Sequence, residues 1–97
     1  MEDLVYKTLV IDKGNKLCTI DGQEVPLTKK EYTFLTFLIS NPNHIYSREE
    51  LLKDVLKVSN SIRSIDTSVS RLRKKLGPYA ANLVTRMGFG YGFEMER

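Results

Sequence analysis

The sequence of 97 residues predicts an α+β fold in one domain, and three observations lead to this prediction. Apolar and polar residues alternate over residues 1–28, which is typical of a small antiparallel sheet. Residues 29–77 then carry apolar residues at helical spacing in three consecutive stretches. Two short stretches within residues 82–96 close the chain as a hairpin. A chain of this length with 41% hydrophobic residues can bury one modest core, so a second domain is not expected.

The N-terminal sheet is predicted from the alternation between Leu9 and Leu27. Polar residues interrupt it at 12–15 and again at Asp21-Gly22. An Asp-Gly pair favours a two-residue hairpin turn, because both residues tolerate a positive φ. Within this sheet Cys18 is interpreted as a small buried strand residue.

Two capping boxes predict the starts of the first two helices. In each box a hydroxyl residue is followed three positions later by a glutamate, as in Thr28 to Glu31 and Ser47 to Glu50. The first helix should end near Ser40, with Phe37 outside its buried stripe, and the second near Lys57. The expected core residues of the two helices are Tyr32, Phe34, Leu35, Leu38 and Ile39, and Leu51, Leu52, Val55 and Leu56.

The third helix is predicted over 61–76, where Gly77-Pro78 should end it. The segment from Ile62 to Leu76 contains five basic residues and one acidic residue, whereas the rest of the chain contains ten basic and eleven acidic residues. The helical period separates an apolar stripe from a cationic face. The stripe contains Ile62, Ile65, Val69, Leu72 and Leu76. The opposite face contains Arg63, Thr67, Ser70, Arg71 and Lys74, with Arg73 and Lys75 on its flanks.

The last element is predicted as a hairpin with strands over 82–86 and 91–95. The glycines at 88, 90 and 92 are interpreted as turn residues. A phosphate-binding loop would have to be followed by a helix, and here a strand follows.

No catalytic, metal or cofactor site is expected. His44 is the single histidine and Cys18 the single cysteine, so neither has a partner for a metal site. Asp66 is interpreted as a partner for side chains of its own helix. The acidic N-terminus and the absence of a long apolar run predict no export and no membrane association, so a cytoplasmic protein that is not an enzyme is expected.

The third predicted helix indicates a binding function instead of a catalytic one. Its cationic face has the width and the donors to enter the major groove of double-stranded DNA, and its small side chains allow close approach. Two alternatives remain open. The domain could bind a protein through Phe37, Phe89 or the link between the second and third helices. RNA binding is less favoured, because the chain lacks aromatic residues on a sheet surface.

The order of several motifs resembles a known family. These motifs are Leu27-Thr28-x-x-Glu31-Tyr32, Asn41-Pro42, Ser47-Arg48-Glu49-Glu50-Leu51-Leu52, the segment from Arg63 to Leu76, and Gly88-Phe89-Gly90-Tyr91-Gly92-Phe93. Together they are similar to the OmpR/PhoB-type winged-helix effector domain of bacterial response regulators. The resemblance implies a winged helix-turn-helix with an N-terminal antiparallel sheet, three helices and a C-terminal wing hairpin.

The resemblance also implies a site and partners. Base-facing positions would be Arg63, Thr67 and Arg71, and phosphate-facing positions Ser64, Ser68, Ser70 and Arg73. The predicted set is completed by Lys74 and Arg86. Implied partners are an N-terminal receiver domain, RNA polymerase and a second copy in tandem on direct-repeat DNA, while the isolated domain should be monomeric. The role would be transcription regulation in a two-component phosphorelay.

The chain departs from the family pattern at three places, and at one of them Ser68 and Ser70 stand where some relatives carry longer donors. Leu56 stands where a tryptophan is common, and the link from there to Arg63 is shorter than usual. Met87 stands where the family carries a wing arginine. Arg86 lies one position earlier and should point to the other face of its strand.

Overall fold

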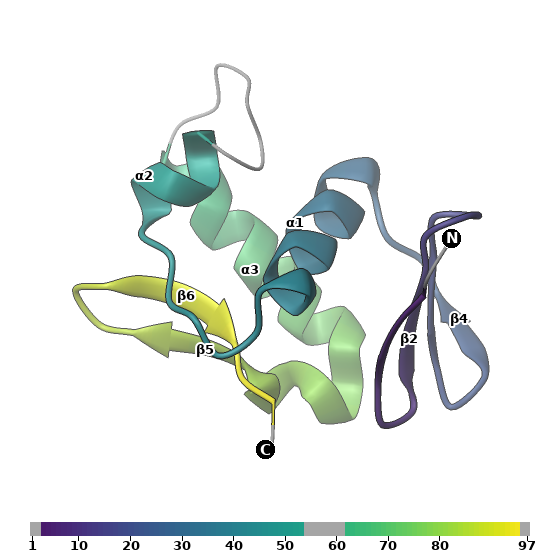
Figure 1. Cartoon of the computed structure of the whole chain (residues 1–97). Coiled ribbons are helices and arrows are strands. Elements are labelled where there is room, and N and C mark those ends of the chain that lie inside the picture. Colours follow the sequence, from purple (N-terminus) through teal and green to yellow (C-terminus); the bar gives the residue numbers. More distant parts are fainter. Residues whose placement is uncertain (1–2, 54–61, 96–97) are drawn as a thin grey trace.

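The computed structural model describes residues 3–53 and 62–95, and it contains two antiparallel sheets on either side of a group of helices (Figure 1). The N-terminal sheet has four strands in the order of the sequence. Its strands are β1 (Leu4–Tyr6), β2 (Leu9–Asp12), β3 (Leu17–Ile20) and β4 (Gln23–Val25). Figure 1 shows this sheet at one end of the molecule, beside α1.

The turn between β3 and β4 confirms the Asp21-Gly22 prediction. The two residues have φ angles of 53° and 80°, and Ile20 pairs with Gln23 across them. Strand β1 was not predicted, because Val5 at its centre is 62% exposed and the three-residue strand shows no clear alternation. Pairing with β2, rather than a local sequence signal, holds β1 in place.

Both capping boxes are present at the predicted positions. They begin α1 (Lys29–Ser40) and α2 (Arg48–Leu51). The Thr28 N–H donates to Glu31 Oε1 at 2.9 Å, and the Ser47 N–H donates to Glu50 Oε1 at 3.1 Å. The part of the predicted second helix over residues 54–57, with Val55 and Leu56, lies outside the described residues.

Helix α3 (Ile62–Leu76) confirms the predicted stripe from Ile65 onward, because Ile65, Val69, Leu72 and Leu76 are all buried. The side chain of Ile62 is not among those that the structure describes. Gly77 ends it with a φ of 55°, as expected. The chain then continues into an unpredicted 3₁₀ helix, η2 (Gly77–Asn82). There Tyr79 is buried, and its hydroxyl lies 2.6 Å from Thr8 Oγ1 and connects η2 to the N-terminal sheet.

The C-terminal hairpin is formed by β5 (Leu83–Arg86) and β6 (Gly90–Phe93). The predicted strands over 82–86 and 91–95 were therefore slightly misplaced. Arg86 pairs with Gly90, so the loop has three residues instead of four. Asn82 belongs to the 3₁₀ helix, and its side-chain amide donates to the Glu94 carbonyl at 2.8 Å.

The connector between α1 and α2 lies against β6, which the sequence did not predict. Tyr46 and Tyr91 exchange backbone hydrogen bonds of 2.8 and 3.0 Å, and the Asn43 N–H donates to the Phe93 carbonyl at 2.8 Å. The prediction that Gly90 and Gly92 are turn residues was wrong, because both belong to β6, and this contact explains why they are glycines. A Cβ on Gly90 would lie 1.9 Å from the Tyr46 carbonyl oxygen, and one on Gly92 would lie 2.3 Å from that of His44.

A buried ion pair joins α1 to α3. Glu31 is 3% exposed, and its carboxylate accepts hydrogen bonds from the Thr28 N–H and from Lys75 Nζ, the latter at 2.6 Å. Burial raises the pKa of this carboxyl, but the hydrogen bonds from Lys75 and Thr28 outweigh burial, so the pKa of Glu31 is lowered from 4.5. The folded chain therefore stabilises the charged form of the Glu31 carboxylate relative to the unfolded chain.

This pair predicts a loss of stability in acid. A group whose pKa is lowered on folding stabilises the fold above its unfolded pKa, and this contribution is lost as the pH falls through the folded pKa. The free energy of unfolding, measured by urea titration, should therefore decrease as the pH falls below about 4.5. Glu31→Gln keeps the capping geometry without the charge, so its pH profile should be flatter in this range. Parallel profiles for the two proteins would contradict this account.

Candidate nucleic-acid interface

The face of α3 opposite its buried stripe is open to solvent, as predicted. The exposed side chains share one side of the helix and line a shallow groove together with Asp66. They are Arg63, Thr67, Ser70, Arg71 and Lys74. Ser64 and Ser68 are half-buried at the flanks of this face. We call the five exposed residues the outer face of α3.

The basic residues of α3 divide into two groups. Within the described part of the chain, Arg63, Arg71 and Lys74 make no ion pair, so their charges are directed to solvent. The side chains of Lys75 and Arg73 instead bind partners within the protein. Lys75 binds Glu31, and Arg73 binds the hairpin. The sequence could not separate these groups, because the partners of Arg73 and Lys75 lie on other elements.

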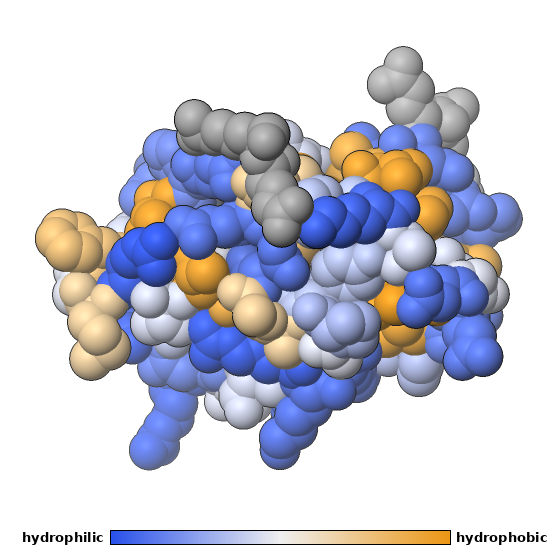
Figure 2. Space-filling view, turned by 90° about the horizontal axis from the view of Figure 1, so that it is seen from below, coloured by the Kyte–Doolittle hydropathy of each residue, from blue (hydrophilic) through white to orange (hydrophobic). Residues whose placement is uncertain are grey.

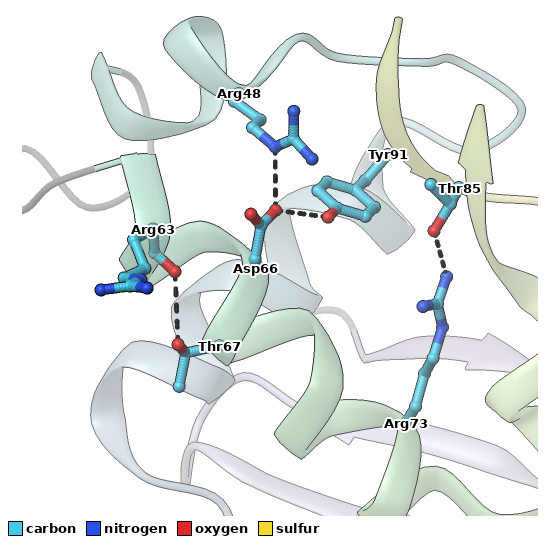
Figure 3. A network of polar contacts seen from close by, with 7 residues as sticks. All are labelled: Arg48, Arg63, Asp66, Thr67, Arg73, Thr85 and Tyr91. Carbon is cyan, nitrogen blue, oxygen red and sulfur yellow. Dashed lines mark hydrogen bonds and ion pairs between the residues drawn. The ribbon is translucent and has the colours of Figure 1, made fainter. Parts of the chain in front are cut away.

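Arg73 connects α3 to β5. Its Nε and Nη2 donate to the Leu83 carbonyl at 3.0 and 2.8 Å. Nη2 also donates to Thr85 Oγ1 at 2.6 Å, the contact drawn in Figure 3. A guanidinium that donates three such bonds is held in one orientation. Arg73 was predicted at a phosphate-facing position, and the structure places it beside the hairpin.

Asp66 connects α3 to two further elements. Its Oδ1 accepts from Arg48 Nε of α2 at 2.8 Å and from the Tyr91 hydroxyl of β6 at 2.5 Å (Figure 3). The prediction that Asp66 serves its own helix was wrong, because both partners come from neighbouring elements. Hydrogen bonds from Tyr91 and Arg48 lower the pKa of Asp66, while burial and the bond to Asp66 raise the pKa of Tyr91.

These contacts hold the hairpin beside α3 through both of its strands. Arg73 binds β5, and Asp66 binds β6. The outer face of α3 and the hairpin are therefore fixed relative to each other by polar contacts in addition to the shared core.

The hairpin tip carries two exposed apolar side chains. Met87 and Phe89 are 87% and 75% exposed. Figure 2 shows hydrophobic residues at the end of the molecule where the hairpin tip lies. At the base of the tip, Arg86 Nη2 lies 2.6 Å from Glu94 Oε2, so this predicted site residue is ion-paired within the hairpin.

His44 and Cys18 take no part in the outer face of α3. The His44 ring packs against Tyr46 with centroids 4.3 Å apart, and Phe37 packs against the same tyrosine at 4.9 Å. Cys18 is buried in β3, where burial raises its pKa to about 11, so the thiol is protonated at neutral pH.

No helix in the described part of the chain is long and apolar enough to cross a bilayer.

The two sheets, the helices and the polar contacts between α3 and the hairpin define a winged-helix domain with a cationic outward helix. Residues 22–93 match the model of the family described as "Transcriptional regulatory protein, C terminal". The chain belongs to this family, which confirms the resemblance seen in the sequence.

Two curated relatives have similar sequences over nearly the whole chain. The transcriptional regulatory protein ResD of Bacillus subtilis is 46% identical over 98 residues, which cover 95% of this chain and 41% of the relative. The transcriptional regulatory protein SrrA of Staphylococcus aureus is 41% identical over 97 residues, which cover 94% of this chain and 40% of the relative. The chain therefore spans about two fifths of the length of these relatives.

Solved structures confirm the fold. The DNA-binding domain of Klebsiella pneumoniae RstA, in complex with the RstA box, superposes with a TM-score of 0.86 at 30% identity and covers 97% of this chain and 98% of that one. The DNA-binding domain of Escherichia coli CpxR superposes with a TM-score of 0.84 at 30% identity, with both chains fully covered.

Proposed function

We propose that this chain binds double-stranded DNA sequence-specifically, as the DNA-binding part of a bacterial response regulator that controls transcription. The observation that carries the proposal is the outer face of α3. Three cations and two short hydroxyl side chains project there from one rigid helix, and the apolar stripe fixes the helix from behind. A helix of this kind fits the major groove.

The proposed contacts follow from where each side chain lies. Arg63 and Arg71 can donate two hydrogen bonds to guanine, and Lys74 can contact phosphate. Ser64, Ser68 and Ser70 reach toward phosphates on either side of the groove. Arg73 would act indirectly, because it binds β5 and so positions the hairpin. Arg86 would lie close to DNA, because it is at the base of the hairpin tip. The tip itself would lie along the adjacent DNA backbone or minor groove.

The names of the relatives support a wider proposal. They are transcriptional regulatory proteins, and the RstA domain was solved with its DNA box. We infer that this domain, over residues 1–97, works in the cytoplasm beside a receiver domain, pairs in tandem on direct-repeat DNA and is monomeric by itself. A contact with RNA polymerase belongs to the same proposal.

The proposal is tested by selecting DNA from a random-sequence library with this chain. We expect a recurrent sequence to be enriched, and the enriched duplex should bind roughly a thousandfold or more tightly than a scrambled duplex. A library that stays random after repeated rounds would overturn sequence-specific binding.

Arg71→Ala should reduce discrimination more than general affinity. The loss of a bidentate base contact costs about 1–3 kcal/mol on the enriched duplex, which is roughly five- to 150-fold, and little on a scrambled duplex. Fluorescence anisotropy titrations of both duplexes measure this difference. Equal losses on the two duplexes would show that Arg71 contacts phosphate instead of a base.

The exposed hairpin tip favours a second candidate function, a protein-interaction module. Phe89 remains available for such a contact, whereas Phe37 is packed against Tyr46. This candidate predicts salt-insensitive binding to a protein partner and no DNA affinity at low salt, the opposite of the result expected for the outer face of α3.

A further inference from the structure

We propose that Thr67 reads the 5-methyl group of a thymine through its own methyl group, with no hydrogen bond from its hydroxyl to DNA. This inference rests on the proposed function, because it requires the outer face of α3 to lie in the major groove. It adds the chemical identity of one base in the recognised sequence and the group that recognises it.

The hydroxyl proton of Thr67 is already used. Thr67 Oγ1 donates to the Arg63 carbonyl oxygen one turn earlier at 3.2 Å (Figure 3). A threonine hydroxyl has a single proton, so this bond leaves Oγ1 with acceptor lone pairs and no donor. Such a bond to the carbonyl four residues back is a usual arrangement for threonine in a helix, and it fixes χ1.

The remaining groups of the side chain restrict what it can recognise. Phosphate oxygens, guanine O6 and N7, and thymine O4 are all acceptors, and Oγ1 cannot donate to them. The methyl group, by contrast, is a good contact for the one apolar group in the major groove, the C5 methyl of thymine.

The position of Thr67 suits a base contact. Thr67 is exposed and lies one helical turn from Arg63 and one turn from Arg71. Ser70, beside it on the same face, is short and leaves the approach open. The helix can therefore bring the Thr67 methyl to the floor of the groove while the two arginines reach to either side.

The test uses the duplex enriched from the random library. Each thymine in turn is replaced by deoxyuridine, which lacks the 5-methyl group and keeps every hydrogen-bonding group. We expect one replacement to weaken binding of the wild-type chain by about three- to fivefold, the value of one buried methyl group. The other replacements should have little effect.

Two variants separate the methyl from the hydroxyl. Thr67→Val keeps a methyl group in place and removes the hydroxyl, so it should keep the same discrimination between thymine and deoxyuridine at that position. Thr67→Ser keeps the hydroxyl and removes the methyl, so it should bind the two duplexes equally. Circular dichroism and thermal unfolding show whether both variants keep the fold, and the ratio between duplexes is insensitive to a uniform loss of affinity.

Two results would overturn the inference while leaving the proposed function intact. One is an enriched duplex whose affinity no deoxyuridine replacement changes. The other is a Thr67→Ser chain that still distinguishes thymine from deoxyuridine at that position, which would mean that another side chain contacts the 5-methyl group. If no duplex is enriched at all, the proposed function itself fails, and this inference fails with it.

Discussion

Replacing Gly90 with alanine should destabilise the fold by about 3 kcal/mol or more, because backbone strain and overpacking act at the same residue. The new Cβ would lie 1.9 Å from the Tyr46 carbonyl oxygen and 2.9 Å from Ser47 Cα, and the φ of Gly90 is 140°. The obstacle is backbone, so it cannot move aside like a side chain. Urea unfolding should show a loss of this size, and thermal unfolding a Tm lower by roughly 12 °C or more.

Two other glycines provide matched controls for Gly90→Ala. Gly88 has a φ of 81° but open space around its Cβ position, so Gly88→Ala should cost about 1 kcal/mol from conformation alone. Gly14 has neither a positive φ nor a close contact below 3.4 Å, so Gly14→Ala should change stability by less than about 1 kcal/mol. Equal effects of Gly90→Ala and Gly88→Ala would mean that the contact between β6 and Tyr46 is not tight.

Removing the three outward cations of α3 together should nearly abolish DNA binding in moderate salt. Each phosphate neutralised by a cation adds about 0.9 to the slope of log affinity against log salt. The triple replacement of Arg63, Arg71 and Lys74 by alanine should therefore reduce the slope by roughly one unit, through the lost phosphate contact of Lys74. It should also reduce the affinity for the enriched duplex at about 0.1 M salt by roughly a hundredfold or more, because both arginines lose their base contacts. Titrations of the enriched duplex at several salt concentrations measure both quantities.

A control with the same change of charge shows whether the position of the cations matters. Lys13 and Lys16 lie in the turn between β2 and β3, and Lys29 is the first residue of α1, so none of the three belongs to the outer face of α3. Replacing these three lysines by alanine should leave most of the salt slope in place. If both triple variants lose the same slope, net charge controls the affinity, and the outer face of α3 is not the binding surface.

The features that the sequence predicted correctly depend on residues close together in the chain. The capping boxes at Thr28 and Ser47 span four residues each, and the Asp21-Gly22 turn spans two. The apolar stripe of α3 repeats every three or four residues, so its burial and the exposure of the opposite face follow from helical geometry.

The features that the sequence did not predict depend on partners far apart in the chain. Arg73 and Lys75 look like additional cations of α3 until the positions of Leu83 and Glu31 are known. Asp66 binds Tyr91, 25 residues later. A single sequence contains no local signal for such pairs, because they are set by how the elements pack.

The most direct test of the central claim is a map of the residues that contact DNA in solution. Backbone amide signals of the ¹⁵N-labelled chain are followed by NMR while a duplex is added. We predict that the largest changes fall on the outer face of α3, from Arg63 to Lys74, with further changes at the hairpin tip. Changes confined to the N-terminal sheet, or none at low salt, would contradict the claim that this helix is the DNA-binding surface.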